Sequence, residues 1–269
     1  MKINKEASTD YRVAEEVEFL GAPVGDDFVE PENQVAGYES INVTLLAGSN
    51  YKDWVRGALY ASLCTWDTTP HNPVSKLLDA QFEEQESKLI SMLGKRPISV
   101  ALEGAVFTFM ITGVPRAMTH QIVRHRQMAF GQQSYRVSSC YSDPVRLPVS
   151  LQERIDSGDE KAAYLKTEYI KAVMQVRTVY RSLIENDIPM EQARCIMPMG
   201  TCTKIGVTMR LRDMIEYFKG RTGDIAQDEH TYIVCLMAKE MKANQPEFFK
   251  FITSKISNLE ETMVKYNVI

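Results

Sequence analysis

The segment VFTFMITGV (106–114) limits the fold more than any other part of the sequence, because it combines β-branched and aromatic residues without a charge. Such a run is typical of a β-strand. The runs SINVTLLA (40–47) and KIGVTMRL (204–211) have the same character. Few strands separated by long helical stretches predict an α+β fold, in which helices pack on a small antiparallel sheet.

Helical periodicity and capping residues locate the helices. Asn50 can cap a helix that reaches about Cys64. Pro115 suits a first helical turn, and Asp224 with Gln227 forms a capping box. The sequence therefore predicts helices over about 50–64, 75–93, 115–127, 160–186, 224–242 and 248–256.

The length of 269 residues fits one large domain or two small ones. Residues 1–38 are acidic and aperiodic, and the run GAPVGDDFVEPENQ within them is rich in turn-forming residues. We therefore expect an N-terminal extension over 1–38 and a single domain over 39–269. The alternative is that the extension forms a strand that pairs with a partner subunit.

Composition argues against several classes of protein. A net charge of −4 opposes general nucleic-acid binding, which needs a basic surface. The five cysteines are scattered and the four histidines lack the spacing of zinc ligands, so we expect reduced cysteines and no metal site. We find no secretory signal and no stretch of ~18 apolar residues that could span a membrane. The expectation is a soluble, cytoplasmic protein without a membrane partner.

Basic residues gather in the segment Gln121-x-x-Arg124-His125-Arg126. On a regular helix Gln121 and Arg124 share a face, whereas Arg124 and Arg126 lie about 200° apart. The two arginines therefore cannot bind one small ligand from an intact helix. Either the helix ends here, or the arginines serve different ligands or subunits.

A polar stretch follows Gly131, where we expect extended backbone. Ser134 and Arg136 then lie on the same side of the chain. A hydroxyl beside a planar guanidinium suits a phosphate group. The alternative is a solvated basic helix end that complements its own dipole.

More arginines lie in the region after residue 200. Arg210 and Arg212 alternate on the predicted strand, so we expect them to share its polar face. Arg221 lies between two glycines, in a predicted turn where side chains often face a site. Ion pairs with Asp213 or Glu216 are the alternative role for these arginines.

The spacing of these residues matches a known signature. Arg124-His125-Arg126, seven further residues and then Ser134 form the RHR-x7-S signature of the flavin-dependent thymidylate synthases, which this chain resembles. Residues 107–126 resemble the family's strand and helix before the signature. Residues 191–229 resemble, without gaps, its region from AR-x-x-LP to H-A-x-x-E. The resemblance covers about residues 40–255.

The resemblance implies a homotetramer that binds FAD between subunits. It implies use of NADPH and methylenetetrahydrofolate to convert dUMP, a pyrimidine nucleoside monophosphate, to dTMP. Arg221 would activate the uracil ring and Ser134 would position it, as the two catalytic residues. The residues expected around dUMP are Gln121, Arg124, Gln132, Gln133, Ser134, Tyr135, Arg136, Arg194 and Arg221. Those expected at FAD are Arg124, His125, Arg126, Gln132, Arg210, Arg212 and Glu216.

The chain departs from the family pattern mainly on the flavin and folate side. Ile98, Gly104 and Ile225 stand where the family has histidines, and Arg210 replaces an asparagine. Two alternatives therefore stay open. One is related C5 methylation or hydroxymethylation of UMP, dCMP or dUMP on the same fold. The other is an inactive nucleotide-binding homologue.

Overall fold

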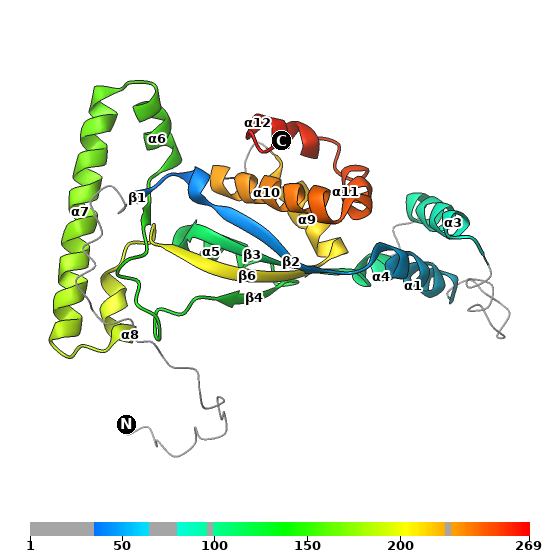
Figure 1. Ribbon diagram of the computed structural model, residues 1–269, viewed down its shortest axis with the longest axis horizontal. Coiled ribbons are helices and arrows are strands. Elements are labelled where there is room, and N and C mark those ends of the chain that lie inside the picture. The colour runs from blue at the N-terminus through cyan, green and yellow to red at the C-terminus, as the bar shows by residue number, and fades with distance from the viewer. Residues whose placement is uncertain (1–34, 65–79, 96–98, 224–226) are drawn as a thin grey trace, which may run out of the picture.

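A computed structural model of the chain describes residues 35–64, 80–95, 99–223 and 227–269 (Figure 1). The fold is built on a four-stranded antiparallel sheet in the order β2-β3-β6-β4. Helices pack on this sheet and extend it at both ends (Figure 1). The predicted combination of helices with a small antiparallel sheet is therefore confirmed. Most of the predicted N-terminal extension lies outside the described residues.

The three predicted strands are all present, as β2 (Asn42–Gly48), β3 (Val106–Pro115) and β6 (Cys202–Arg210). β3 and β6 pair along their whole length and form the centre of the sheet. The edge strand β4 (Ala129–Gln132) was not predicted. Its four residues include a glycine and carry too little strand-forming character to be noticed.

A layer formed by four helices covers one face of the sheet (Figure 1). The helices are α9 (Leu211–Arg221), α10 (Asp228–Asn244), α11 (Pro246–Thr253) and α12 (Leu259–Lys265). The strands turn alternate side chains toward this layer, as their period of two requires. The sheet side chains that are fully buried there include Phe107, Phe109, Ile111, Ile205 and Val207.

One end of the sheet carries α1 (Tyr51–Cys64), α3 (Phe82–Lys95) and α4 (Ser99–Glu103) (Figure 1). The predicted cap of α1 is confirmed, because the Asn50 side chain accepts a hydrogen bond of 3.1 Å from the backbone of Asp53. The α1–α4 contact is fixed by the Trp54 indole, which donates to the Ala101 carbonyl at 2.7 Å. This end of the sheet positions Glu103, the last residue of α4.

The other end is formed by α5 (Arg116–Ile122), α6 (Val149–Asp156), the predicted long helix α7 (Glu160–Glu185) and α8 (Met190–Ala193). Asp159 caps α7 by accepting from two backbone amides at 2.9 and 3.1 Å. A short parallel pair of two-residue strands, β1 (Val35–Ala36) and β5 (Val145–Arg146), lies beside them, and the 3-10 turn Arg194–Ile196 follows α8. Within the described ranges, no helix is both long and apolar enough to cross a bilayer.

Several helix boundaries differ from the prediction. The helix expected over 115–127 ends at Ile122, because the chain must reverse before β4 and the amides of Arg124 and His125 bond three residues back instead of four. The helix expected over 248–256 ends at Thr253, and the strand expected over 204–211 ends at Arg210. Residues 75–79, where α3 was expected to begin, and Asp224 of the expected capping box lie outside the described residues. Among the described helices, five were not predicted: α4, α6, α8, α9 and α12.

Candidate active site

Arg221 and His125 form the centre of the candidate site. Arg221 is the last residue of α9, and its Nη2 lies 3.1 Å from Nε2 of His125. Guanidinium only donates hydrogen bonds, so Nε2 of His125 accepts and the neutral ring carries its proton on Nδ1. The prediction that Arg221 lies in a turn was wrong, because the helical pattern continues through the bond from Thr222 to Phe218.

Burial and the neighbouring cation keep His125 neutral. Desolvation, and then the positive charge of Arg221, lowers the pKa of His125. The ring also meets Tyr217 edge to face, with centroids 4.9 Å apart. Arg221 therefore has a neutral hydrogen-bond acceptor, which leaves the positive charge of its guanidinium unneutralised.

His230 from α10 is buried, and its ring packs against that of Tyr217 with 5.6 Å between the ring centroids. Burial, followed by the charges of Arg221 and His125, lowers the pKa of His230 to about 3. Neither ring nitrogen of His230 has a hydrogen-bond partner in the described part of the chain, and the same holds for Arg221 Nε and the Tyr217 hydroxyl. Buried polar atoms are seldom left unpaired, so this cluster carries unused hydrogen-bonding capacity beside Arg221.

Arg124 and Arg126 lie in the turns that follow α5, so the alternative in which the helix ends before them is confirmed. Both side chains are exposed, and neither forms an ion pair with a described residue. Two guanidinium groups without carboxylate partners are suited to bind anions.

Gln121 and Gln132 connect α5 to its neighbours. The side-chain amide of Gln121 donates to the side chain of Gln227, at the start of α10. Gln132, the last residue of β4, donates to Thr119 at 2.9 Å. Both predicted residues therefore lie around the helix that precedes the arginine-rich turn.

The segment around Ser134 is a turn, so the predicted extended backbone was wrong there. The Ser134 carbonyl accepts from the amides of Val137 and Ser138 at 3.2 and 3.0 Å. The Ser134 hydroxyl is exposed, at 3.4 Å from the amide of Arg136. Tyr135 is buried and donates its hydroxyl to the Cys202 carbonyl at 2.5 Å, so its phenol serves the core.

Glu191 brings together two of the arginines that were expected around dUMP. Its carboxylate pairs with Arg136 at 3.0 Å, and its backbone carbonyl accepts from Arg194 at 3.1 Å. Gln133 lies nearby, where its carbonyl accepts from Arg116 at 2.9 Å. This group forms at the end of β6 that begins with Cys202.

Arg210 and Arg212 lie at the other end of β6, where Glu103 from α4 contacts both, at 3.5 and 2.9 Å. Arg210 also pairs with the buried carboxylate of Asp213 at 2.8 Å, as the ion-pair alternative expected. The strand face they were expected to share does not exist, because Arg212 belongs to α9. Glu216 is exposed and forms no ion pair with a described residue.

Glu103 was not among the predicted site residues. In the sequence, Glu103 could be noticed only by its position directly before Gly104, in the segment where the chain departs from the family pattern. The two arginine groups lie at opposite ends of a nine-residue strand, which spans roughly 26 Å. No single nucleotide can contact both groups within one chain.

The Asp213 pair predicts a measurable effect on stability. We expect Asp213→Asn to lower the free energy of unfolding by about 1–3 kcal/mol, since a charged hydrogen bond in the first turn of α9 is lost. Urea unfolding measures the change. The matched control is Glu216→Gln on the same helix, which should change stability by less than about 0.5 kcal/mol. Equal effects of the two variants would contradict the assignment.

Comparisons with known proteins agree on one family. A family model described as thymidylate synthase complementing protein matches residues 50–247. A flavin-dependent thymidylate synthase of Geobacter sulfurreducens is 34% identical over 150 residues, which are 55% of this chain and 62% of the relative. The enzyme of that name from Sulfurisphaera tokodaii is 33% identical over 56% of each chain. The one from Pyrococcus furiosus is 32% identical over 65% of this chain and 68% of the relative. The chain thus spans little more than half the length of the first two relatives.

Proposed function

Because the chain belongs to the thymidylate synthase complementing protein family, we propose that it converts dUMP to dTMP by flavin-dependent reductive methylation. Methylenetetrahydrofolate would supply the carbon and NADPH the reducing equivalents. Residues 39–269 would act as one catalytic domain. The observation that carries the proposal is the Arg221 guanidinium, held by a neutral imidazole at the end of α9.

Arg221 would act on the uracil ring. C5 of uracil is a poor nucleophile until electron density enters the ring. A cation beside N3 and its neighbouring carbonyl favours the deprotonated ring, and a guanidinium presents planar donors to a planar anion. The neutral His125 takes one donor of Arg221 and leaves the others for a ligand.

The basic residues of the chain fit a flavin dinucleotide. Arg124 and Arg126 are exposed, without carboxylate partners in the described part of the chain, and they could bind pyrophosphate oxygens. We propose that His125, Gln132, Arg212 and Glu216 complete the FAD site, with Arg210 acting on Arg212 through Glu103. Bound FAD would supply the redox chemistry, passing reducing equivalents from NADPH to the one-carbon unit.

Where the proposed nucleotide and flavin sites adjoin, they need more than one copy of the chain. Gln133, Ser134, Arg136 and Arg194 would hold dUMP, together with Gln121, Arg124, Gln132 and Arg221, and the buried Tyr135 would support this segment from the core. Since the group around Glu191 and the group around Glu103 lie at opposite ends of β6, a site that uses both groups must combine subunits. This separation supports an assembly with FAD and nucleotide at subunit interfaces, which we propose is a homotetramer.

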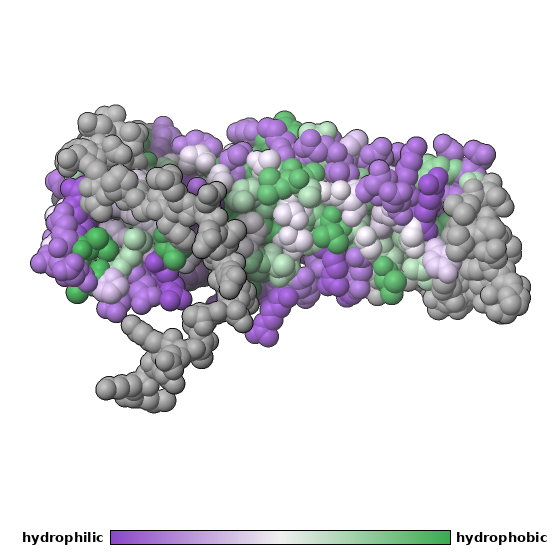
Figure 2. Space-filling model, turned by 60° about the horizontal axis from the view of Figure 1, so that its bottom comes forward, coloured by the Kyte–Doolittle hydropathy of each residue, from purple (hydrophilic) through white to green (hydrophobic). Residues whose placement is uncertain are grey.

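The sheet face opposite the helical layer offers a surface for such contacts. Thr108, Met110 and Thr208 on this face are only half-buried. Figure 2, in which the lower side of Figure 1 comes forward, shows apolar residues gathered over the middle of the molecule, with hydrophilic residues above and below. Apolar surface with a polar border is typical of protein–protein interfaces.

Ser134 is expected to position the nucleotide without forming a covalent bond to it. Its exposed hydroxyl contacts the amide of Arg136, and no described histidine or carboxylate hydrogen-bonds to it as a general base would. We expect Ser134→Ala to raise KM for dUMP by roughly 2- to 12-fold, the value of one hydrogen bond. Steady-state kinetics checks this. A trapped adduct between Ser134 and the nucleotide would refute the positioning role.

Product analysis tests the proposed function. Protein loaded with FAD is incubated with NADPH, methylenetetrahydrofolate and one of dUMP, UMP or dCMP, and the products are identified by mass spectrometry. The proposal requires dTMP from dUMP. A hydroxymethylated product, or modification of UMP or dCMP, would indicate the related C5 chemistry. Binding of a nucleotide without turnover of any would indicate an inactive homologue.

A further inference from the structure

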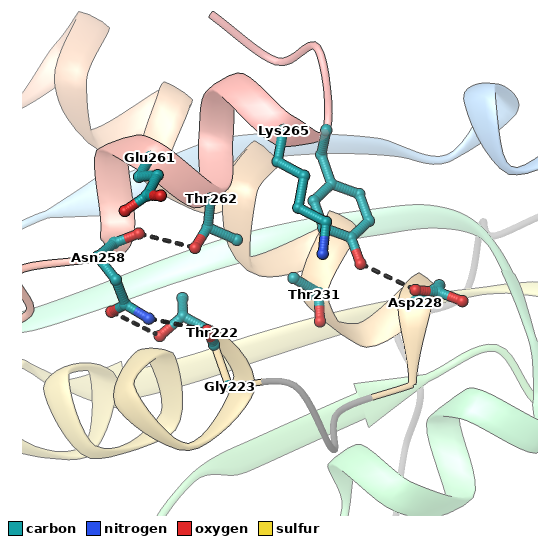
Figure 3. Close-up of a pocket in the computed structure, with 9 residues that line it drawn as sticks. Thr222, Gly223, Asp228, Thr231, Asn258, Glu261, Thr262 and Lys265 are labelled. Atoms are coloured by element: carbon teal, nitrogen blue, oxygen red, sulfur yellow. Dashed lines mark hydrogen bonds between the residues drawn. The ribbon is translucent and has the colours of Figure 1, made fainter.

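At the C-terminal end of α9, which carries Arg221, two backbone carbonyls accept hydrogen bonds from side chains of other segments (Figure 3). Thr231 of α10 donates its hydroxyl to the Arg221 carbonyl at 2.9 Å. Asn258, directly before α12, donates its side-chain amide to the Thr222 carbonyl at 2.9 Å. Thr222 returns a hydrogen bond of 3.3 Å from its hydroxyl to the Asn258 side-chain oxygen.

These bonds serve groups that a helix end leaves unpaired. The last four carbonyls of an α-helix have no partner within the helix, and such ends fray. Thr222 and Thr231 are both buried, so water replaces these bonds poorly. The glycines on either side, Gly220 and Gly223, have no side chain to hold the backbone, and a Cβ added at either position would meet no other atom within 4 Å. The backbone around Arg221 therefore depends on Thr231 and Asn258 for its position.

Thr222, Thr231 and Asn258 line a cavity of about 620 Å³ beside the end of α9. Lys265 and Tyr266 of the C-terminal segment also line it. Asn258 and α12 lie beyond residues 50–247, which the family model matches. The contact to Thr222 is therefore a feature of this chain that the match to the family does not describe.

We propose that Asn258 and Thr231 are positioning residues for Arg221. They fix the last turn of α9, so that the guanidinium stays against His125 and meets the substrate in one orientation. The inference rests on the proposed function, in which Arg221 acts on the uracil ring. It concerns residues that touch neither substrate nor flavin.

Asn258→Asp tests the proposal in the full chain loaded with FAD. The carboxylate keeps the shape and still accepts from Thr222, but it cannot donate to the Thr222 carbonyl and places a negative charge against it. Asp is as suitable as Asn at the start of α12, so the helix is preserved. Thr231→Val removes the other bond with little change of shape. Lys265→Gln in the same cavity is the control, because the Lys265 side chain forms no hydrogen bond or ion pair with the described residues of α9.

Two measurements separate positioning from general damage. Release of the C5 proton from dUMP should fall roughly 10- to 100-fold in kcat, with a smaller change in KM and normal flavin reduction by NADPH. The pKa of His125, followed by NMR without substrate, should rise toward its ordinary value of 6.5 as Arg221 moves away. Lys265→Gln should change neither quantity.

A folded Asn258→Asp variant with normal kcat and an unchanged His125 pKa overturns the proposal, and so does the same loss in Lys265→Gln. If Asn258→Asp does not fold, Thr231→Val decides in the same way. If the unaltered protein releases no proton from dUMP, the proposed function fails. The NMR measurement then still decides whether Asn258 and Thr231 hold Arg221 against His125.

Discussion

Replacing Arg221 with alanine is expected to lower the rate of C5 proton release from dUMP by about 10²-fold or more. The fold and the reduction of the flavin by NADPH should be retained, because Arg221 ends its helix and its side chain contacts His125 alone among the described hydrogen-bond partners. The loss should fall on the chemical step, since under the proposed function the guanidinium acts where negative charge develops in the ring.

Tritium release from labelled dUMP measures this step directly. Arg221→Lys keeps the charge without the planar donors, so it should recover only part of the rate. Arg154→Ala is the control, because Arg154 lies on α6, pairs with Asp159 at the start of α7, and is not one of the proposed site residues. Near-normal proton release from Arg221→Ala would show that the activating group is another residue.

The second large effect concerns acid stability and His230. Its pKa is about 3 in the folded protein, compared with 6.5 for an ordinary histidine. At a pH between these two values, His230 binds a proton in the unfolded chain but not in the folded protein. The free energy of unfolding therefore falls as the pH is lowered through this range. Between pH 7.5 and pH 5 this histidine alone should remove about 2 kcal/mol.

His230→Leu should abolish that part of the pH dependence, because leucine fills the buried position without a proton to bind. Urea unfolding at pH 7.5, 6 and 5 measures it, and the variant should lose about 2 kcal/mol less than the unaltered protein. His120→Gln, at an exposed position on α5, should keep the original slope. The same slope in all three proteins would show that His230 is not the group responsible.

The sequence was most informative where local pattern and tertiary structure agree. The strands β2, β3 and β6 carry alternating or continuous apolar residues that the sheet buries, and α7 has a long helical pattern with its Asp159 cap. For these elements periodicity and burial have the same cause. Their positions were predicted within a few residues.

The contacts of the candidate site depend on packing between distant segments. Nothing in the local sequence shows that Arg221 meets His125, because 96 residues separate them and the contact needs α9 to lie beside the turn after α5. Glu103 reaches Arg212 across 109 residues for a similar reason. The turn at Ser134 was also missed, since backbone bonds between amides and carbonyls leave no mark in residue type.

The position of the arginine groups at the two ends of β6 constrains how the sequence of such a protein can evolve. Substitutions around Glu191 alter one group and leave the other in place, so the affinities of the proposed nucleotide and flavin sites can change separately. The strand itself has no such freedom. An insertion or deletion of one residue in β6 would turn every later side chain to the opposite face, including Arg210. Tolerance to point substitution at both ends, with intolerance to length change between them, follows from this geometry.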